Sequence, residues 1–208
     1  MTPSIAVPPI PDVRTLGRLA LGGVAGLVVW EFWARVITVW VVGGPLEPPA
    51  LIISLVQHWT GYELNYEVAR ALHYLVGVVG YPVAYWIVSR GLRNWAPIFD
   101  IGVWAIFTAY LVYAFAKGFG TPFMGAFWVL VTALSATRFF NPDSLIADSL
   151  SWGSFTWFNA LGIMAPLAGL PFLLLDGGDW LSFMSWAGHV IYGAIAVYVF
   201  AKLAGTKG

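Results

Sequence analysis

Two histidines stand in apolar stretches of the chain, where a titratable side chain is rare and usually has a function. His73 lies in the stretch ALHYLVGVVG, and His189 lies in the stretch AGHVIYGAIA. Small residues stand one helical turn before and after each of them: Ala69 and Gly77 around His73, and Ser185 and Gly193 around His189. They leave room beside each imidazole, either for a flat macrocycle or for a closely packed neighbouring helix.

An imidazole in a membrane helix is suited to three kinds of chemistry. His73 and His189 together could hold a b-type haem through both axial positions. Each could instead hold one chlorophyll- or bacteriochlorophyll-type pigment, or the two could form a proton relay. The structural alternative is that each histidine hydrogen-bonds to a neighbouring helix while Gly77 and Gly193 form packing surfaces. The third histidine, His58, is expected in a loop, so this route provides for one haem at most.

A pair of opposite charges lies near the middle of the first apolar stretch. Glu31 and Arg35 are four residues apart in the sequence WEFWAR, which places both side chains on one face of a helix. A paired charge costs much less in a bilayer than a lone one. The pair is therefore either a site for a proton or polar substrate, or a structural ion pair. Upstream, the spacing of Gly22 and Gly26 predicts a close helix contact.

A second polar cluster precedes His73 in the sequence YELNYEVARALH. Glu67, Arg70 and His73 are three residues apart and share one stripe of a helix. Arg70 is expected to pair with Glu67 or, across helices, with Glu31. A nitrogen–oxygen metal site at His73 with either carboxylate would need more ligands than this pattern offers, so no metal site is predicted.

The elements that carry these side chains must be membrane helices, because the chain is too apolar for a soluble domain. Of its 208 residues, 60% are hydrophobic and 10% are charged, whereas the surface of a soluble domain is about 25–35% charged. A net charge of zero argues against nucleic acid as a partner. The absence of cysteine excludes disulfides, iron–sulfur clusters and thiolate metal sites. Twelve Trp and nine Tyr residues fit aromatic belts at the membrane surfaces.

Apolar stretches of about 20 residues predict an all-α, polytopic membrane protein with six transmembrane helices. A Pro-rich N-terminal arm is expected over 1–15 and a single transmembrane domain over 16–204, with a surface-lying or re-entrant segment over about 48–62. Pro166 and Pro171 are expected to kink or break the fifth helix. The predicted spans are 16–42, 66–89, 98–117, 122–140, 152–175 and 181–204.

The distribution of charge predicts that both termini are cytoplasmic. With that orientation Lys117 is the single basic residue outside, and seven basic residues lie inside: Arg14, Arg18, Arg90, Arg93, Arg138, Lys202 and Lys207. The helices that carry His73 and His189 then run in the same direction. We expect them to be parallel, with both histidines about 10–12 Å below the outer surface.

Three segments resemble the YagU-like group of small bacterial inner-membrane proteins. They are GRLALGGVAGLVVWEFWA, HYLVGVVGYPVAYWIV and AGHVIYGAIAVYVF, and they cover about a third of the chain. The Trp-rich region 95–180 departs from the pattern of that group. The resemblance implies a small helical protein of the bacterial inner membrane and implies no particular chemistry.

These features favour an accessory or cofactor-binding subunit of a bacterial electron-transfer assembly, photosynthetic or respiratory, which contacts the bilayer and other membrane subunits. Short loops place the working groups inside the membrane. A small transporter or channel that uses Glu31 and Arg35 is the first alternative, since a Pro-broken helix can line a substrate site. A membrane-embedded enzyme acting on a lipid or a quinone is the second, although no recognisable catalytic constellation is present and an enzyme is not the favoured class.

Overall fold

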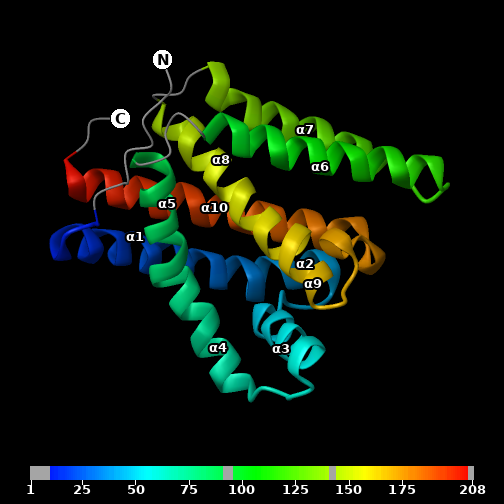
Figure 1. Ribbon diagram of the computed structural model, residues 1–208, viewed down its shortest axis with the longest axis horizontal. Helices are drawn as coiled ribbons and strands as arrows, with labels where there is room; N and C mark the ends of the chain where they lie inside the picture. The colour runs from blue at the N-terminus through cyan, green and yellow to red at the C-terminus, as the bar shows by residue number, and fades with distance from the viewer. Residues whose placement is uncertain (1–9, 91–95, 141–143, 206–208) are drawn as a thin grey trace.

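The computed structural model describes residues 10–90, 96–140 and 144–205, and within these residues all regular structure is helical (Figure 1). Residues 1–9 of the predicted N-terminal arm lie outside the described part. Helix α1 begins at Val13, where the Asp12 side chain accepts a hydrogen bond of 2.7 Å from the Thr15 backbone N–H. The hydrogen bonds from Thr15 lower the pKa of the Asp12 carboxyl. The first helix therefore starts within the segment predicted as an arm.

Within the described residues, three helices are long and apolar enough to cross a membrane. The first comprises α1 (Val13–Phe32), the π-helical turn η1 (Trp33–Ile37) and α2 (Thr38–Val42). The second comprises α4 (Tyr66–Leu75), the π-helical turn η2 (Val76–Gly80) and α5 (Tyr81–Arg90). The third is α10 (Asp179–Ala204). They correspond to the predicted spans 16–42, 66–89 and 181–204.

The remaining helices lie between these three in the sequence. Helices α6 (Ala96–Ala116) and α7 (Pro122–Phe140) form a hairpin that follows the predicted spans 98–117 and 122–140 (Figure 1). The fifth predicted span differs: α8 (Leu145–Trp157), η3 (Phe158–Met164) and α9 (Ala165–Leu167) form one helix that begins before residue 152 and ends well before 175. It ends one residue after Pro166, and Pro171 precedes the separate turn η4 (Phe172–Gly177), as expected from the two prolines.

Residues of the predicted surface or re-entrant segment form the short helix α3 (Pro48–Thr60). Its 13 residues are too few to cross the hydrocarbon core of a bilayer, which requires about 20. α3 lies beside α4 and also contacts α9 (Figure 1). This segment therefore covers one side of the region where His73 lies.

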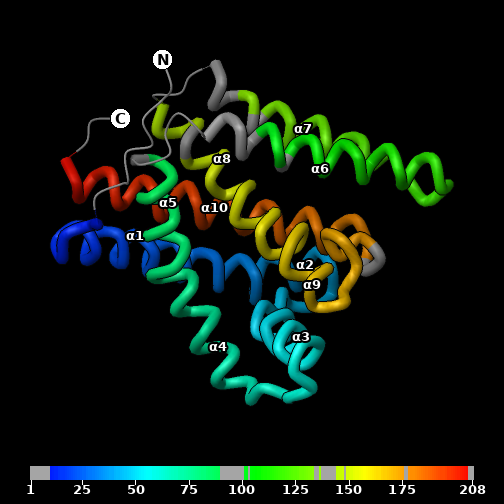
Figure 2. The backbone as a smooth tube through the Cα atoms, viewed as in Figure 1, coloured from blue at the N-terminus to red at the C-terminus, as the bar shows by residue number. Residues whose placement is uncertain are grey.

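Helices α1 and α10 pack side by side and run in opposite directions, so α1 begins and α10 ends at the same end of the molecule (Figure 2). Helix α4–η2–α5 crosses both of them obliquely (Figure 1). The two histidine helices therefore cross at an angle, and their common direction across a membrane stays a prediction. The sign of the loop charges constrains which way a helix runs, but the crossing angle depends on where the backbones can approach.

Glycine residues allow the backbones of two other helices to approach α1 closely, one on each of two sides. A Cβ atom on Gly22 would lie 2.5 Å from the Ala196 carbonyl oxygen of α10, and one on Gly26 would lie 2.9 Å from Tyr192. The close contact predicted from the spacing of Gly22 and Gly26 is therefore present. A Cβ on Gly23 would lie 2.5 Å from the Val78 carbonyl oxygen, so the next position along α1 contacts the crossing helix.

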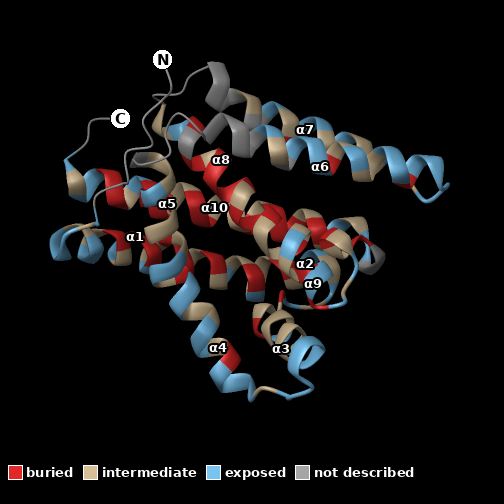
Figure 3. Cartoon of the chain, in the orientation of Figure 1, coloured by how far each residue is buried: buried red, intermediate tan, exposed pale blue. Residues whose placement is uncertain are grey.

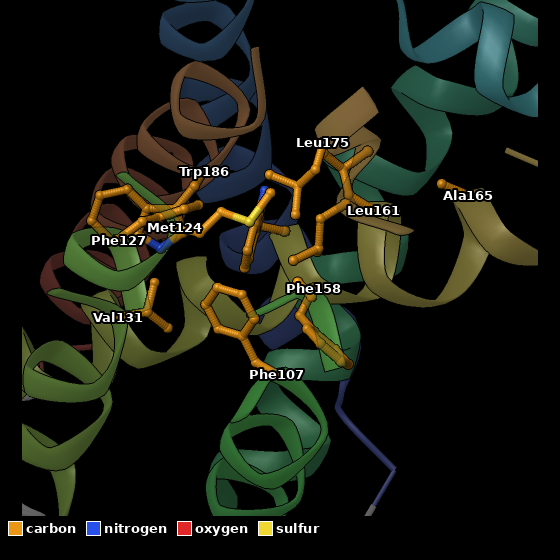
Figure 4. Close-up of a cluster of buried hydrophobic side chains, with 12 residues drawn as sticks. Phe107, Met124, Phe127, Val131, Phe158, Leu161, Ala165, Leu175 and Trp186 are labelled. Atoms are coloured by element: carbon orange, nitrogen blue, oxygen red, sulfur yellow. The ribbon is translucent and has the colours of Figure 1, made fainter. Parts of the chain in front are cut away.

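Buried side chains concentrate on α8, α10 and one face of α1 (Figure 3). The largest buried cluster joins α6, α7, α8, η3 and α10, and its aromatic members include Phe107, Phe127, Trp157 and Trp186. Figure 4 shows Phe127 against Trp186, with Phe107 between α6 and the rest of the cluster. This cluster attaches the α6–α7 hairpin to α8 and α10, and η3 and α10 also carry residues of the site described next.

Candidate ligand cavity at the two histidines

Both histidines line one cavity of about 280 Å³ between α1, α3, α4, η3 and α10. Most of its wall is apolar, and the polar groups come from Trp30, Glu47, Tyr81, Asn159, Ser185 and the two imidazoles. The apolar part of the wall includes Leu51, Ile52, Leu161, Met164, Leu174 and Leu181. An apolar cavity with a few convergent polar groups is the usual form of a small-molecule site.

His189 is held by its own helix. Its Nδ1 lies 2.8 Å from the Ser185 carbonyl oxygen, and because a carbonyl only accepts, Nδ1 carries the hydrogen. In the neutral imidazole Nε2 therefore keeps its lone pair. That nitrogen can accept a hydrogen bond or coordinate a metal ion at the cavity.

His73 contacts Glu31 on the neighbouring helix. Its Nε2 lies 3.4 Å from Oε1 of Glu31, while Oε2 of the same carboxylate accepts a hydrogen bond of 2.6 Å from Nε of Arg35. Glu31 thus lies between an imidazole on the cavity wall and a guanidinium that is 39% exposed. The expected ion pair of Glu31 with Arg35 is present, and Glu31 also contacts His73. Arg70 pairs with Glu67 rather than with Glu31.

The indole of Trp30 lies against both imidazoles. Its ring centroid is 5.2 Å from that of His73 and 5.9 Å from that of His189. The ring is buried, and its Nε1–H has no hydrogen-bond partner among the described residues. A buried donor without a partner is costly, so a ligand that accepts a hydrogen bond from Trp30 would remove that cost.

Tyr81 and Asn159 add a second polar group to the wall. The Asn159 side-chain amide donates to the Tyr81 hydroxyl over 3.2 Å, and that hydroxyl donates to the Thr156 carbonyl oxygen over 3.4 Å. The amide keeps a second N–H and its carbonyl oxygen for a ligand. Donors and acceptors therefore approach the cavity from more than one helix.

The two glycines near the histidines are sites of helix contact. The Gly77 carbonyl oxygen accepts a hydrogen bond of 2.6 Å from the Tyr192 hydroxyl, and a Cβ on Gly77 would lie 3.1 Å from Leu27. A Cβ on Gly193 would lie 2.7 Å from Gly153 on α8. The space beside each imidazole was expected to hold either a macrocycle or a neighbouring helix. At both glycines a neighbouring helix occupies it.

Beyond Glu31 the polar groups continue toward the surface. The Tyr66 hydroxyl donates to Oε2 of Glu47 over 2.6 Å, and Arg35 interacts with both of these residues. The second predicted ion pair, Glu67 with Arg70, lies at the same helix start and is exposed. Glu47 also lines the cavity, so the contacts of Arg35 with Glu31 and Glu47 join two parts of one polar group at the cavity wall.

Glu31→Gln is expected to lower the free energy of unfolding by about 2 kcal/mol, because it leaves the Arg35 charge without its carboxylate. The loss should be smaller than for a fully buried pair, since Arg35 is partly exposed. Denaturant titration in mixed micelles measures it.

The matched control is Glu67→Gln, which breaks an exposed pair on the same side of the molecule and should change stability by less than about 0.5 kcal/mol. The double variant Glu31→Gln/Arg35→Gln should recover part of the loss, because no uncompensated charge remains. Equal losses for Glu31→Gln and Glu67→Gln would contradict the interpretation.

Four of the residues that line the cavity with polar groups were not singled out from the sequence, and one of them, Glu47, directly precedes the predicted surface segment. Trp30, Tyr81 and Asn159 were missed because Trp and Tyr are common at membrane surfaces and a single Asn has no motif. The only sequence signal is that Trp30 directly precedes Glu31, on the helix that carries the Gly22 and Gly26 contact surface.

Comparisons with protein-family models, curated protein sequences and solved structures found no match. Within the described residues, no group of three or more His, Asp or Glu side chains is arranged to hold a metal ion. The functional assignment therefore depends on the geometry of the cavity.

Proposed function

We propose that the protein binds the ring of a quinone in the histidine cavity, as a membrane-embedded accessory subunit of an electron-transfer assembly in the bacterial inner membrane. The observation that carries the proposal is that His73, His189 and Trp30, whose buried indole N–H has no hydrogen-bond partner among the described residues, line one mainly apolar cavity. A quinone combines an apolar ring with carbonyl oxygens that accept hydrogen bonds. Its reduced form donates through hydroxyl groups.

The polar groups of the wall match both forms of such a ring. Trp30 Nε1–H and the free N–H of Asn159 can donate to the carbonyl oxygens of a quinone. Nε2 of His189 can accept from a hydroxyl of the quinol, because its Nδ1–H is held by the Ser185 carbonyl. The apolar side chains of Leu161, Met164 and other residues contact the faces of the ring.

The size of the cavity favours a single ring over a tetrapyrrole. A dry cavity of about 150 Å³ accommodates benzene, and this cavity is about 280 Å³. It therefore has room for one substituted ring, whereas haem or bacteriochlorophyll has four pyrrole rings around a metal. The Trp30 indole also lies against both imidazoles, so a macrocycle held by both histidines would require Trp30 to move.

The proposal includes six transmembrane helices with both termini in the cytoplasm. The apolar helices α6 and α7 and the helix α8–η3–α9 would supply three spans in addition to the three long ones. The excess of basic residues on one side supports this orientation.

His189→Phe is expected to reduce the quinone that remains bound at least tenfold, because it keeps the ring volume but removes Nε2; this equals about 1.4 kcal/mol. The measurement is the molar ratio of quinone to protein, determined by mass spectrometry of a solvent extract after purification in mild detergent.

The matched control is His58→Phe, because His58 does not line the cavity. This variant should retain the wild-type ratio of quinone to protein. Equal ratios in all three proteins would contradict the proposal. A Soret band in the absorption spectrum of the purified protein would instead assign the histidines to haem, and red or far-red bands would assign them to a pigment.

A further inference from the structure

A second, larger cavity lies at the turn between α6 and α7, where η4 leads into α10. Its volume is about 580 Å³, and it shares no lining residue with the histidine cavity. The wall contains four aromatic rings, of Tyr110, Tyr113, Phe119 and Phe172, and one carboxylate, of Asp179. The proposed quinone function uses none of these side chains.

The aromatic rings form a continuous wall. The Tyr110 and Phe172 centroids are 4.3 Å apart, the Tyr110 and Phe119 centroids 6.3 Å, and the Tyr113 and Phe119 centroids 5.9 Å. The rings come from three separate parts of the chain: α6, the α6–α7 turn and η4. Folding therefore assembles this wall from residues distant in sequence.

Two observations indicate that the wall attracts positive charge. The Asp179 carboxylate is half-buried, and its Oδ2 accepts a hydrogen bond of 2.9 Å from the Thr121 hydroxyl. Nζ of Lys117 lies 6.0 Å from the centroid of the Tyr113 ring, at the outer limit of a cation–π interaction, so this ring already faces one cation of the chain itself. A carboxylate and several π faces thus meet at one cavity.

We propose that this cavity binds a quaternary ammonium group. An alkylated ammonium has no N–H, so it needs aromatic faces and one negative charge rather than several acceptors, and this is what the wall provides. A primary ammonium needs three acceptors, and a divalent cation needs more oxygen ligands than one carboxylate. The chemistry is that of choline, either as a free small molecule or as the headgroup of phosphatidylcholine.

The experiment has one arm for each source. Isothermal titration calorimetry of the purified protein with tetramethylammonium and with choline tests the free cation. Native mass spectrometry after mixing with equal amounts of phosphatidylcholine and phosphatidylethanolamine tests the lipid, since these headgroups differ in the methyl groups on nitrogen. The neutral compound 3,3-dimethylbutan-1-ol has the shape of choline without its charge and serves as the ligand control.

Asp179→Asn is expected to weaken binding of the cation at least tenfold, and Phe119→Leu about threefold to tenfold. Phe32→Leu is the matched control, because Phe32 is an exposed aromatic residue of α1 outside the cavity, and it should bind as wild type does. Binding in the first arm alone assigns a soluble ligand, and preference for phosphatidylcholine assigns a lipid.

The proposal is overturned if neither arm detects binding, if the neutral alcohol binds as tightly as choline, or if Asp179→Asn and wild type have the same affinity. Its outcome is independent of the quinone measurement, because the variants and the ligands differ.

Discussion

Replacing Gly153 with leucine is expected to abolish the folded protein, with a loss of more than about 4 kcal/mol in the free energy of unfolding. A Cβ on Gly153 would lie 2.5 Å from Cα of Val190 and 2.7 Å from the His189 carbonyl oxygen. Both are backbone atoms, so no side-chain rotation can make room. Helices α8 and α10 would have to separate along their contact, which also includes Gly193 of α10.

Smaller changes at the same position make this expectation testable when the leucine variant does not fold. Gly153→Ala adds one methyl group at the same contact and should cost about 1–3 kcal/mol, measured by denaturant titration in mixed micelles. Because the contact adjoins His189, Gly153→Ala should also lower the amount of bound quinone.

Gly17→Ala is the matched control. Gly17 is also helical, but a Cβ there would meet nothing within 4 Å, so alanine should stabilise the protein by up to about 1 kcal/mol through its higher helix propensity. If Gly153→Ala were as stable as Gly17→Ala, the close packing of α8 on α10 would be wrong.

Features that depend on one helix alone could be predicted from the sequence. The spacing of Glu31 and Arg35 places their side chains together on any α-helix, and the structure contains that contact. The spacing of Gly22 and Gly26 likewise predicts a surface where another helix can approach closely. The three longest apolar helices also follow from hydropathy.

Features that depend on how helices cross could not be predicted in this way. The contact of His73 with Glu31 joins α4 to α1, and the sequence offered both Glu31 and Glu67 as partners. The oblique path of α4–η2–α5 depends on which backbone lies against Gly23, and no spacing within one helix contains that information.

The aromatic residues illustrate the same limit. Composition assigned Trp to belts at the membrane surfaces, but Trp30 lies buried between the two imidazoles and Trp157 lies in the main cluster. Asn159 is a single polar residue on an apolar helix, and it becomes part of a site because Tyr81 of another helix meets it. Tertiary contact, rather than residue type, decides which of these side chains can bind a ligand.

Replacing Trp157 with alanine is expected to lower the free energy of unfolding by about 3–5 kcal/mol. The side chain is 0% exposed, and its ring centroid lies 5.3 Å from that of Phe127 and 6.1 Å from that of Phe107. Its removal leaves a cavity where α6 and α7 pack on α8. The same denaturant titration measures the loss, and Trp40→Ala is the control, because that side chain is 78% exposed and should cost less than about 0.5 kcal/mol.

A phenylalanine at position 157 separates ring packing from hydrogen bonding. The Trp157 Nε1–H is buried and has no hydrogen-bond partner among the described residues, and a buried donor without a partner costs about 1–3 kcal/mol. Trp157→Phe removes that donor while it keeps an aromatic ring against Phe107 and Phe127, so it should cost clearly less than Trp157→Ala. Equal losses for the two variants would mean that the indole N–H has a partner in the folded protein or that the whole bicyclic ring is required for packing. A loss for Trp157→Ala no larger than that for Trp40→Ala would contradict the position of the α6–α7 hairpin against α8.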